Sequence, residues 1–149
     1  DTLLLIKIGK NKTRIYDING TYHIKKNCFE IVDESCQYYG SSCDGRIKGT
    51  KMILGSNYKV PIIVEESNES IFFPTESPNS HNCSWLSLNN VKKYEREQGF
   101  TKVTFNSGKQ IIVKMSIASF ENQLLRANRL GSVVRKRTKD NEPKQVITP

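Results

Sequence analysis

Alternating apolar and polar positions dominate the first three quarters of the chain and predict extended structure. Short segments rich in Ile, Val, Phe and Tyr cover 3–8, 14–18, 22–25, 60–64, 71–73 and 84–94. Further strands are predicted over 28–32, 36–39 and 50–54. Asn19-Gly20 predicts a tight hairpin, and Asn106-Ser107-Gly108 predicts another between 103–105 and 110–113. Pro61 and Pro74 place their strands at sheet edges or strand ends.

The hydrophobic period changes at Ser116, after which apolar residues recur every three or four positions. One apolar stripe is formed by Ile117, Phe120, Leu124, Ala127 and Gly131. At about 100° per residue this stripe predicts a helix, and Ser116 is placed to cap its start. Three arginines fall roughly opposite the stripe and are predicted to face outward: Arg126, Arg129 and Arg137. A solvated helix face without a ligand is the alternative.

The order of these elements predicts the fold class. Hairpins dominate and no strand–helix–strand rhythm appears, so we expect an α+β fold, a largely antiparallel sheet with one long C-terminal helix packed on it. Residues 1–137 are predicted to form a single domain, and residues 138–149 a flexible C-terminal tail. The longest apolar run, Leu3 to Ile6, is far shorter than the roughly 18 residues that span a bilayer, so we expect a soluble protein without a membrane partner.

Charge narrows the class of partner. The chain of 149 residues has 23 Lys and Arg against 15 Asp and Glu, a net charge of +8, which favours an anionic or phosphate-bearing partner. The acids gather in two patches, over 30–34 and over 65–76. The molecule is therefore predicted to be electrically polarised.

Residues 40–51, GSSCDGRIKGTK, are the predicted working segment. They are expected to form a flexible loop between two strands, in which glycine lets the backbone approach a ligand closely. The loop carries Arg46, Lys48 and Lys51, a combination that suits a polyanion. A glycine-rich surface turn whose charges only face solvent is the alternative.

Catalysis finds little support in the sequence. His23 and His81 have no metal-recruiting spacing, and the four cysteines match no zinc pattern, so we predict no metal, no cofactor and no enzyme activity. The cysteines are expected to be reduced in an intracellular context. A thiol or metal enzyme centred on Cys43 remains an alternative, because Arg46 and Lys48 would favour its thiolate.

Several uncommon strings occur in an order and spacing that resembles the ComK family, the competence transcription factors of Gram-positive bacteria. These strings are FEIVDESCQYYGSSCDGRIKGTK, PIIVEESNESIFFPT, CSWLSLNNVK, VTFNSGK and SFENQLLRA, between Phe29 and Arg137. The resemblance implies a cytoplasmic, nucleoid-associated activator of competence (DNA uptake) genes. It also implies binding to AT-rich promoter boxes through the minor groove, self-association across paired boxes and adaptor-mediated proteolysis.

The residues suggest how such DNA binding would work. Arg46, flanked by Gly45 and Gly49, is predicted to enter the narrow minor groove of AT-rich DNA. The other predicted DNA-binding residues hold phosphates or extend the contacts: Lys48, Lys51, Arg126, Arg129, Lys136 and Arg137. A protein-interaction module that uses the acidic residues between 65 and 76 and ignores DNA is the alternative.

Overall fold

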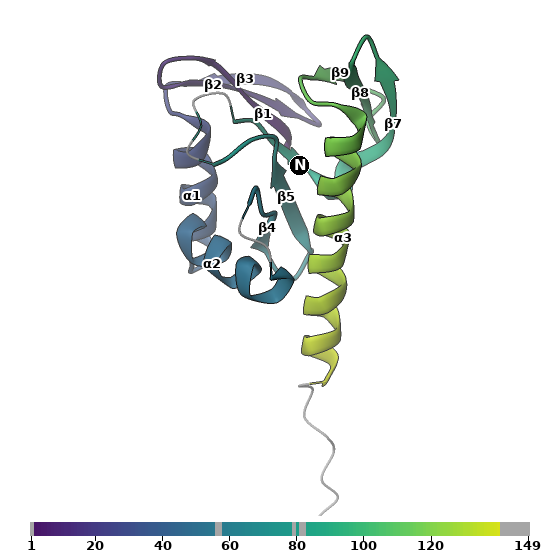
Figure 1. Ribbon diagram of the computed structural model, residues 1–149. Coiled ribbons are helices and arrows are strands. Elements are labelled where there is room, and N and C mark those ends of the chain that lie inside the picture. The colour runs from purple at the N-terminus through teal and green to yellow at the C-terminus, as the bar shows by residue number, and fades with distance from the viewer. Residues whose placement is uncertain (1, 56–57, 79, 81–82, 141–149) are drawn as a thin grey trace, which may run out of the picture.

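The computed structural model describes residues 2–55, 58–78, 80 and 83–140 and contains two antiparallel sheets and three long helices (Figure 1). The elements are β1 (Thr2–Gly9), β2 (Lys12–Asp17), β3 (Gly20–Ile24), α1 (Cys28–Tyr38), α2 (Cys43–Leu54), β4 (Ile62–Glu65), β5 (Ser70–Pro74), β6 (Trp85–Ser87), the 3-10 helix η1 (Leu88–Asn90), β7 (Val91–Glu97), β8 (Phe100–Phe105), β9 (Gln110–Val113) and α3 (Ile117–Asp140).

The larger sheet has six strands in the order β3-β2-β1-β6-β5-β4, and the smaller sheet has the order β7-β8-β9. All strand pairs are antiparallel, which confirms the predicted fold class. Both predicted hairpins are confirmed, β2–β3 around Asn19-Gly20 and β8–β9 around Gly108, whose φ is 91°.

Side-chain alternation along the central strands builds two cores on opposite faces of the larger sheet. Leu5 pairs with Trp85, and both pack in the core beneath α1 and α2. Leu4 pairs with Leu86, and both pack in the core formed with α3 and the smaller sheet. The large sheet therefore lies between a layer of two helices and a layer made of α3 and β7–β9, as Figure 1 shows.

The strands predicted over 28–32 and 36–39 are wrong, because residues 28–38 form helix α1. Asn27 caps this helix: its Oδ1 accepts a hydrogen bond from the Glu30 backbone N–H at 2.8 Å. The buried positions Cys28, Val32 and Cys36 recur every four residues, as a helix facing a sheet requires. Two of these three positions are cysteines, which do not mark an apolar helical stripe as clearly as aliphatic residues do. The β-branched and aromatic residues around them therefore suggested strands.

The single strand predicted over 84–94 is interrupted by η1, which carries the chain from the larger sheet to the smaller one. Two asparagines hold this crossing: the Asn89 side chain accepts from the Ile71 N–H at 3.3 Å, and the Asn90 carbonyl accepts from the Asn106 N–H at 2.8 Å. The alternation therefore predicted extended structure correctly, but its two halves, β6 and β7, are strands of different sheets.

The C-terminal helix is confirmed, and Ser116 caps it through its Oγ, which accepts from the Ser119 N–H at 3.2 Å. Phe120 is fully buried and packs edge-on against Phe73, with ring centroids 5.7 Å apart. The helix continues to Asp140, so 138–140 are helical rather than part of a tail, and 141–149 lie outside the described residues. Figure 1 shows its last turns projecting beyond the sheets. No described helix is long and apolar enough to span a bilayer.

Candidate nucleic-acid interface

The glycine-rich segment predicted as a loop is largely helical, and 43–54 form α2, so the strand predicted over 50–54 is also wrong. Its first turn is capped twice: the Cys43 N–H donates to Asp33 Oδ1 at 2.8 Å, and the Gly45 N–H donates to Ser42 Oγ at 3.0 Å. Gly55 ends the helix in the left-handed conformation, with φ at 66°. These caps offset the low helix propensity of two internal glycines.

Arg46 lies on this helix and not on a flexible finger. Its Nη1 donates to Glu66 Oε1 at 2.8 Å, and 21% of its side chain is exposed. Its Nε is buried and has no hydrogen-bond partner among the described residues. The predicted loop geometry is therefore wrong, because the fold brings the basic segment against an acidic residue of the β4–β5 turn. Whether Arg46 contacts DNA stays a prediction.

The outward face of α2 carries the remaining predicted residues of this segment. Gly45, Lys48 and Gly49 are exposed, whereas Lys51 is half-buried. A Cβ added at Gly49 would meet no atom within 4 Å. The α2 backbone is consequently bare at Gly49, next to Lys48, and a phosphate backbone can approach it closely there, whereas a Cβ at Gly45 would lie 3.0 Å from Ser42 Oγ.

The predicted arginine face of α3 divides into bound and free cations. Arg126 is half-buried, and its Nη1 donates to the Tyr58 carbonyl at 2.7 Å, so this arginine is already engaged within the fold. Arg129, Lys136 and Arg137 are exposed, and none has an acidic partner among the side chains that the structure describes. Two of them lie on the last turns of α3.

Gln123, which the sequence reasoning missed, anchors α3 to the rest of the fold. It is 2% exposed, and its Nε2 donates to the Lys59 carbonyl at 2.8 Å and to the Pro74 carbonyl at 2.7 Å. The chain between α2 and β4 is thus held on α3 by both Gln123 and Arg126. A polar residue inside the apolar stripe of α3 was the signal that could have identified it.

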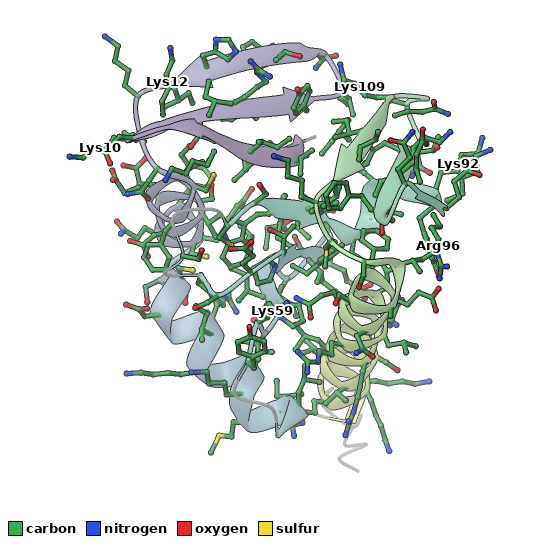
Figure 2. The ribbon with its side chains drawn as sticks, turned by 45° about the horizontal axis from the view of Figure 1, so that its top comes forward. Lys10, Lys12, Lys59, Lys92, Arg96 and Lys109 are labelled. Atoms are coloured by element: carbon green, nitrogen blue, oxygen red, sulfur yellow. The ribbon has the colours of Figure 1, made fainter. Side chains whose placement is uncertain are left out.

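A second group of exposed cations lies on the sheets. It includes Lys10, Lys12, Lys92, Arg96 and Lys109. Figure 2 shows Lys10 and Lys12 at the β1–β2 turn and Lys92 and Arg96 beside the smaller sheet. Lys109 lies over the Tyr16 ring, with its Nζ 4.8 Å from the ring centroid. This sheet surface is therefore an alternative site to α2 and α3 for binding an anionic ligand.

The four cysteines are free and buried, so the predicted activation of Cys43 is wrong. Burial raises the pKa of Cys43 well above its usual range, and burial raises the pKa of Cys36 to about 11 and that of Cys83 to about 12. These thiols therefore stay protonated near neutral pH. No group of three or more His, Cys, Asp or Glu in the described part could hold a metal, and His81 lies outside that part.

Comparison with known proteins agrees with the resemblance seen in the sequence. The family described as "ComK protein" matches residues 2–139, nearly the whole chain. The chain belongs to the ComK family. It is 35% identical over 138 residues to a relative from Bacillus subtilis (strain 168) named "Competence transcription factor". The aligned region covers 92% of this chain and 72% of the relative. No solved structure matches this ComK-family chain.

Proposed function

We propose that this ComK-family protein is a DNA-binding transcriptional activator of competence genes, and that α3 and α2 contact the DNA. The observation that carries the proposal is that several exposed cations of α3, among them Arg129, Lys136 and Arg137, have no acidic partner among the described side chains. Unpaired cations on one element favour phosphate binding, because ligand phosphates do not compete with internal carboxylates. The name of the Bacillus subtilis relative, "Competence transcription factor", supports the same assignment.

The proposed target is AT-rich DNA, contacted largely through the minor groove. Its minor groove is narrow and strongly negative, which attracts arginine side chains even where a helix backbone cannot enter. In this proposal Arg129 and Arg137 enter the groove and Lys136 contacts phosphates. Discrimination is then mainly A·T against G·C, because the minor groove presents a degenerate pattern.

Helix α2 contributes contacts to the phosphate backbone in this proposal. Lys48 and Lys51 bind phosphates, Gly49 permits the close approach described above, and the exposed Gly45 lies at the first turn of the same helix. Arg126 acts as a positioning residue: together with Gln123 it ties the segment after α2 to α3. The two DNA-contacting helices are consequently held in one fixed arrangement, which reduces the conformational cost of binding.

A salt titration of the unmodified protein with AT-rich and GC-rich duplexes tests the proposal. With three lysines on phosphates and two arginines in the minor groove, each displacing a counterion, we expect log K to fall linearly with log salt with a slope of about −4.5, and the AT-rich duplex to bind more tightly at every salt concentration. Absence of binding at physiological salt would instead favour a protein-interaction module. The acidic residues that such a module would use are partly engaged already, since Glu66 pairs with Arg46 and Glu69 with Arg135.

Comparing Arg46→Ala with Glu66→Gln separates a positioning role for Arg46 from direct contact with DNA. The ion pair supports a positioning role, so we expect each variant to lower the free energy of unfolding by about 1 kcal/mol or less. We also expect the ratio of affinities for AT-rich and GC-rich duplexes to stay unchanged in both. If Arg46→Ala lost the preference for AT-rich DNA and Glu66→Gln kept it, the result would support the direct contact between Arg46 and DNA that the sequence predicted.

The family relationship also suggests partners beyond DNA. We include in the proposal self-association on paired boxes and turnover through a proteolytic adaptor and its protease. The DNA target would place the protein at the nucleoid in the cytoplasm. Cross-linking on a duplex with two boxes, compared with a duplex with one, tests the first of these proposals.

A further inference from the structure

The turn between β4 and β5 is acidic and engages one arginine from each of the two helices proposed to bind DNA. Arg46 of α2 donates to Glu66 Oε1 at 2.8 Å, and Arg135 of α3 donates to Glu69 Oε2 at 2.6 Å. Figure 1 shows β4 and β5 between these two helices. A single turn therefore neutralises one cation on each helix.

The two ion pairs differ in how easily they can open. Only 21% of the Arg46 side chain is exposed and its Nε is buried, so this arginine is fixed within the fold. In the other pair, 56% of the Arg135 side chain and 39% of the Glu69 side chain are exposed. Both of these residues line a groove of about 570 Å³ between the turn and α3. Arg135 can therefore leave Glu69 by rotation of its side chain alone.

While it is paired, Arg135 is turned away from the other cations of α3. A Cβ added at Gly131, one turn earlier, would lie only 3.3 Å from Arg135 Nη1, so the guanidinium is folded back over this glycine. At about 100° per residue, Arg135 lies about 120° around the helix from Arg129, whereas Lys136 lies within about 20° of it. The ion pair thus keeps Arg135 off the face that carries the proposed DNA contacts.

The backbone of Glu69 indicates that its carboxylate has a role beyond shaping the turn. Its φ is 50°, in the left-handed region that favours glycine or asparagine over other residues. Its N–H donates to the Glu66 carbonyl at 3.0 Å, a bond that any residue other than proline could make. An exposed ion pair adds little to stability. Stability of the turn therefore does not account for a glutamate here, whereas the contact with Arg135 does.

We propose that Glu69 withholds Arg135 from DNA, so that the β4–β5 turn is an autoinhibitory contact in which a carboxylate takes the place of a DNA phosphate. This inference rests on the proposed function. Once free, Arg135 reaches phosphates that approach its neighbour Lys136 and Lys139, which lies one turn further along α3. Phosphates are the same in every sequence, so the withheld cation weakens binding to all duplexes alike. The turn thereby limits sequence-independent binding.

Glu69→Gln, which removes the charge and keeps the size of the side chain, tests the proposal. Fluorescence anisotropy of labelled AT-rich and GC-rich duplexes over a series of salt concentrations measures affinity and salt dependence. We expect this variant to bind both duplexes about threefold to tenfold more tightly near physiological salt, by the same factor for each. We also expect log K to fall more steeply with log salt by about 0.9, because one more cation displaces a counterion.

Glu65→Gln is the matched control. It removes the same charge from the same turn, but Glu65 has no Lys or Arg partner among the described side chains. Its loss therefore frees no cation and acts only through screened, long-range repulsion. We expect affinity within about twofold of that of the unmodified protein and an unchanged salt dependence.

Arg135→Ala shows whether the gain passes through this arginine. Combined with Glu69→Gln it is expected to restore the salt dependence of the unmodified protein, and the four proteins form a double-mutant cycle. By itself it is expected to leave the salt dependence unchanged, because Glu69 already withholds the arginine. Circular dichroism and the fluorescence of Trp85, the single tryptophan, which is buried, show that each variant is folded.

Two results would overturn the autoinhibitory contact. One is a folded Glu69→Gln variant that binds no more tightly than Glu65→Gln. The other is a salt dependence that Arg135→Ala alone makes shallower by about 0.9, which would show that Arg135 already contacts phosphate in the unmodified protein. In both cases the unmodified protein still binds DNA, so the proposed function stands. If neither the unmodified protein nor Glu69→Gln bound either duplex, this inference and the proposed function would both fail.

Discussion

Alanine at Arg129, Lys136 and Arg137 together is expected to lower the affinity for an AT-rich duplex roughly a hundredfold or more, and to reduce the steepness of log K against log salt by about 3. The physical reason is that all three side chains are exposed on α3 and pair with no acid among the described side chains, so each is available to replace a counterion at a phosphate. Fluorescence anisotropy of a labelled duplex over a series of salt concentrations measures both quantities.

A second triple variant, Lys92→Ala with Arg96→Ala and Lys109→Ala, is the matched control. It removes the same charge from the sheet surface shown in Figure 2, and all three residues are exposed. We expect it to lower affinity only slightly, through the loss of long-range attraction. If the control triple lost more affinity than the α3 triple, the DNA-binding surface would be the one formed by the sheets and the proposal for α3 would be wrong.

Gln123→Leu is expected to lower the free energy of unfolding by about 2–4 kcal/mol. Leucine has a similar size but donates no hydrogen bond, so the variant leaves the Lys59 and Pro74 carbonyls without the donor that they share in a nearly solvent-free site. Denaturant unfolding followed by Trp85 fluorescence measures the change, because this tryptophan is fully buried in the folded protein.

The neighbouring substitution Asn122→Leu provides the control for the effect of leucine on α3. Asn122 is exposed on the same helix, so we expect a change within about 0.5 kcal/mol. A Gln123→Leu variant as stable as the control would show that the two carbonyls do not depend on this side chain. The docking of α3 would then rest on the apolar packing around Phe120 and on the Arg126 hydrogen bond to the Tyr58 carbonyl.

The accuracy of the sequence analysis differed between elements for physical reasons. The turn at Asn19-Gly20 and the stripe that begins at Ile117 are local patterns, in which neighbouring residues alone favour one conformation. Helices α1 and α2 were missed because their inward positions include Cys28, Cys36 and Cys43, which a pattern of aliphatic residues does not reveal. Their caps at Asn27 and Ser42 were the available signals.

The candidate site shows the same division. The basic character of α3 and the exposure of Arg129 and Arg137 follow from helical periodicity. The states of Arg46 and Arg126 do not, since each is bound by a residue distant in sequence, Glu66 and Tyr58 respectively. Local composition therefore predicted which residues are cationic but not which of them are free.

By itself the sequence determined the hairpins, the capped C-terminal helix, the excess of positive charge and the family, because each of these depends on residues close together in the chain or on their order along it. Only the tertiary structure decided that Glu66 engages Arg46, that Gln123 joins α3 to two distant carbonyls, and that β3 lies at the edge of the larger sheet. Those features arise from contacts between segments that are brought together only when both faces of the larger sheet are covered.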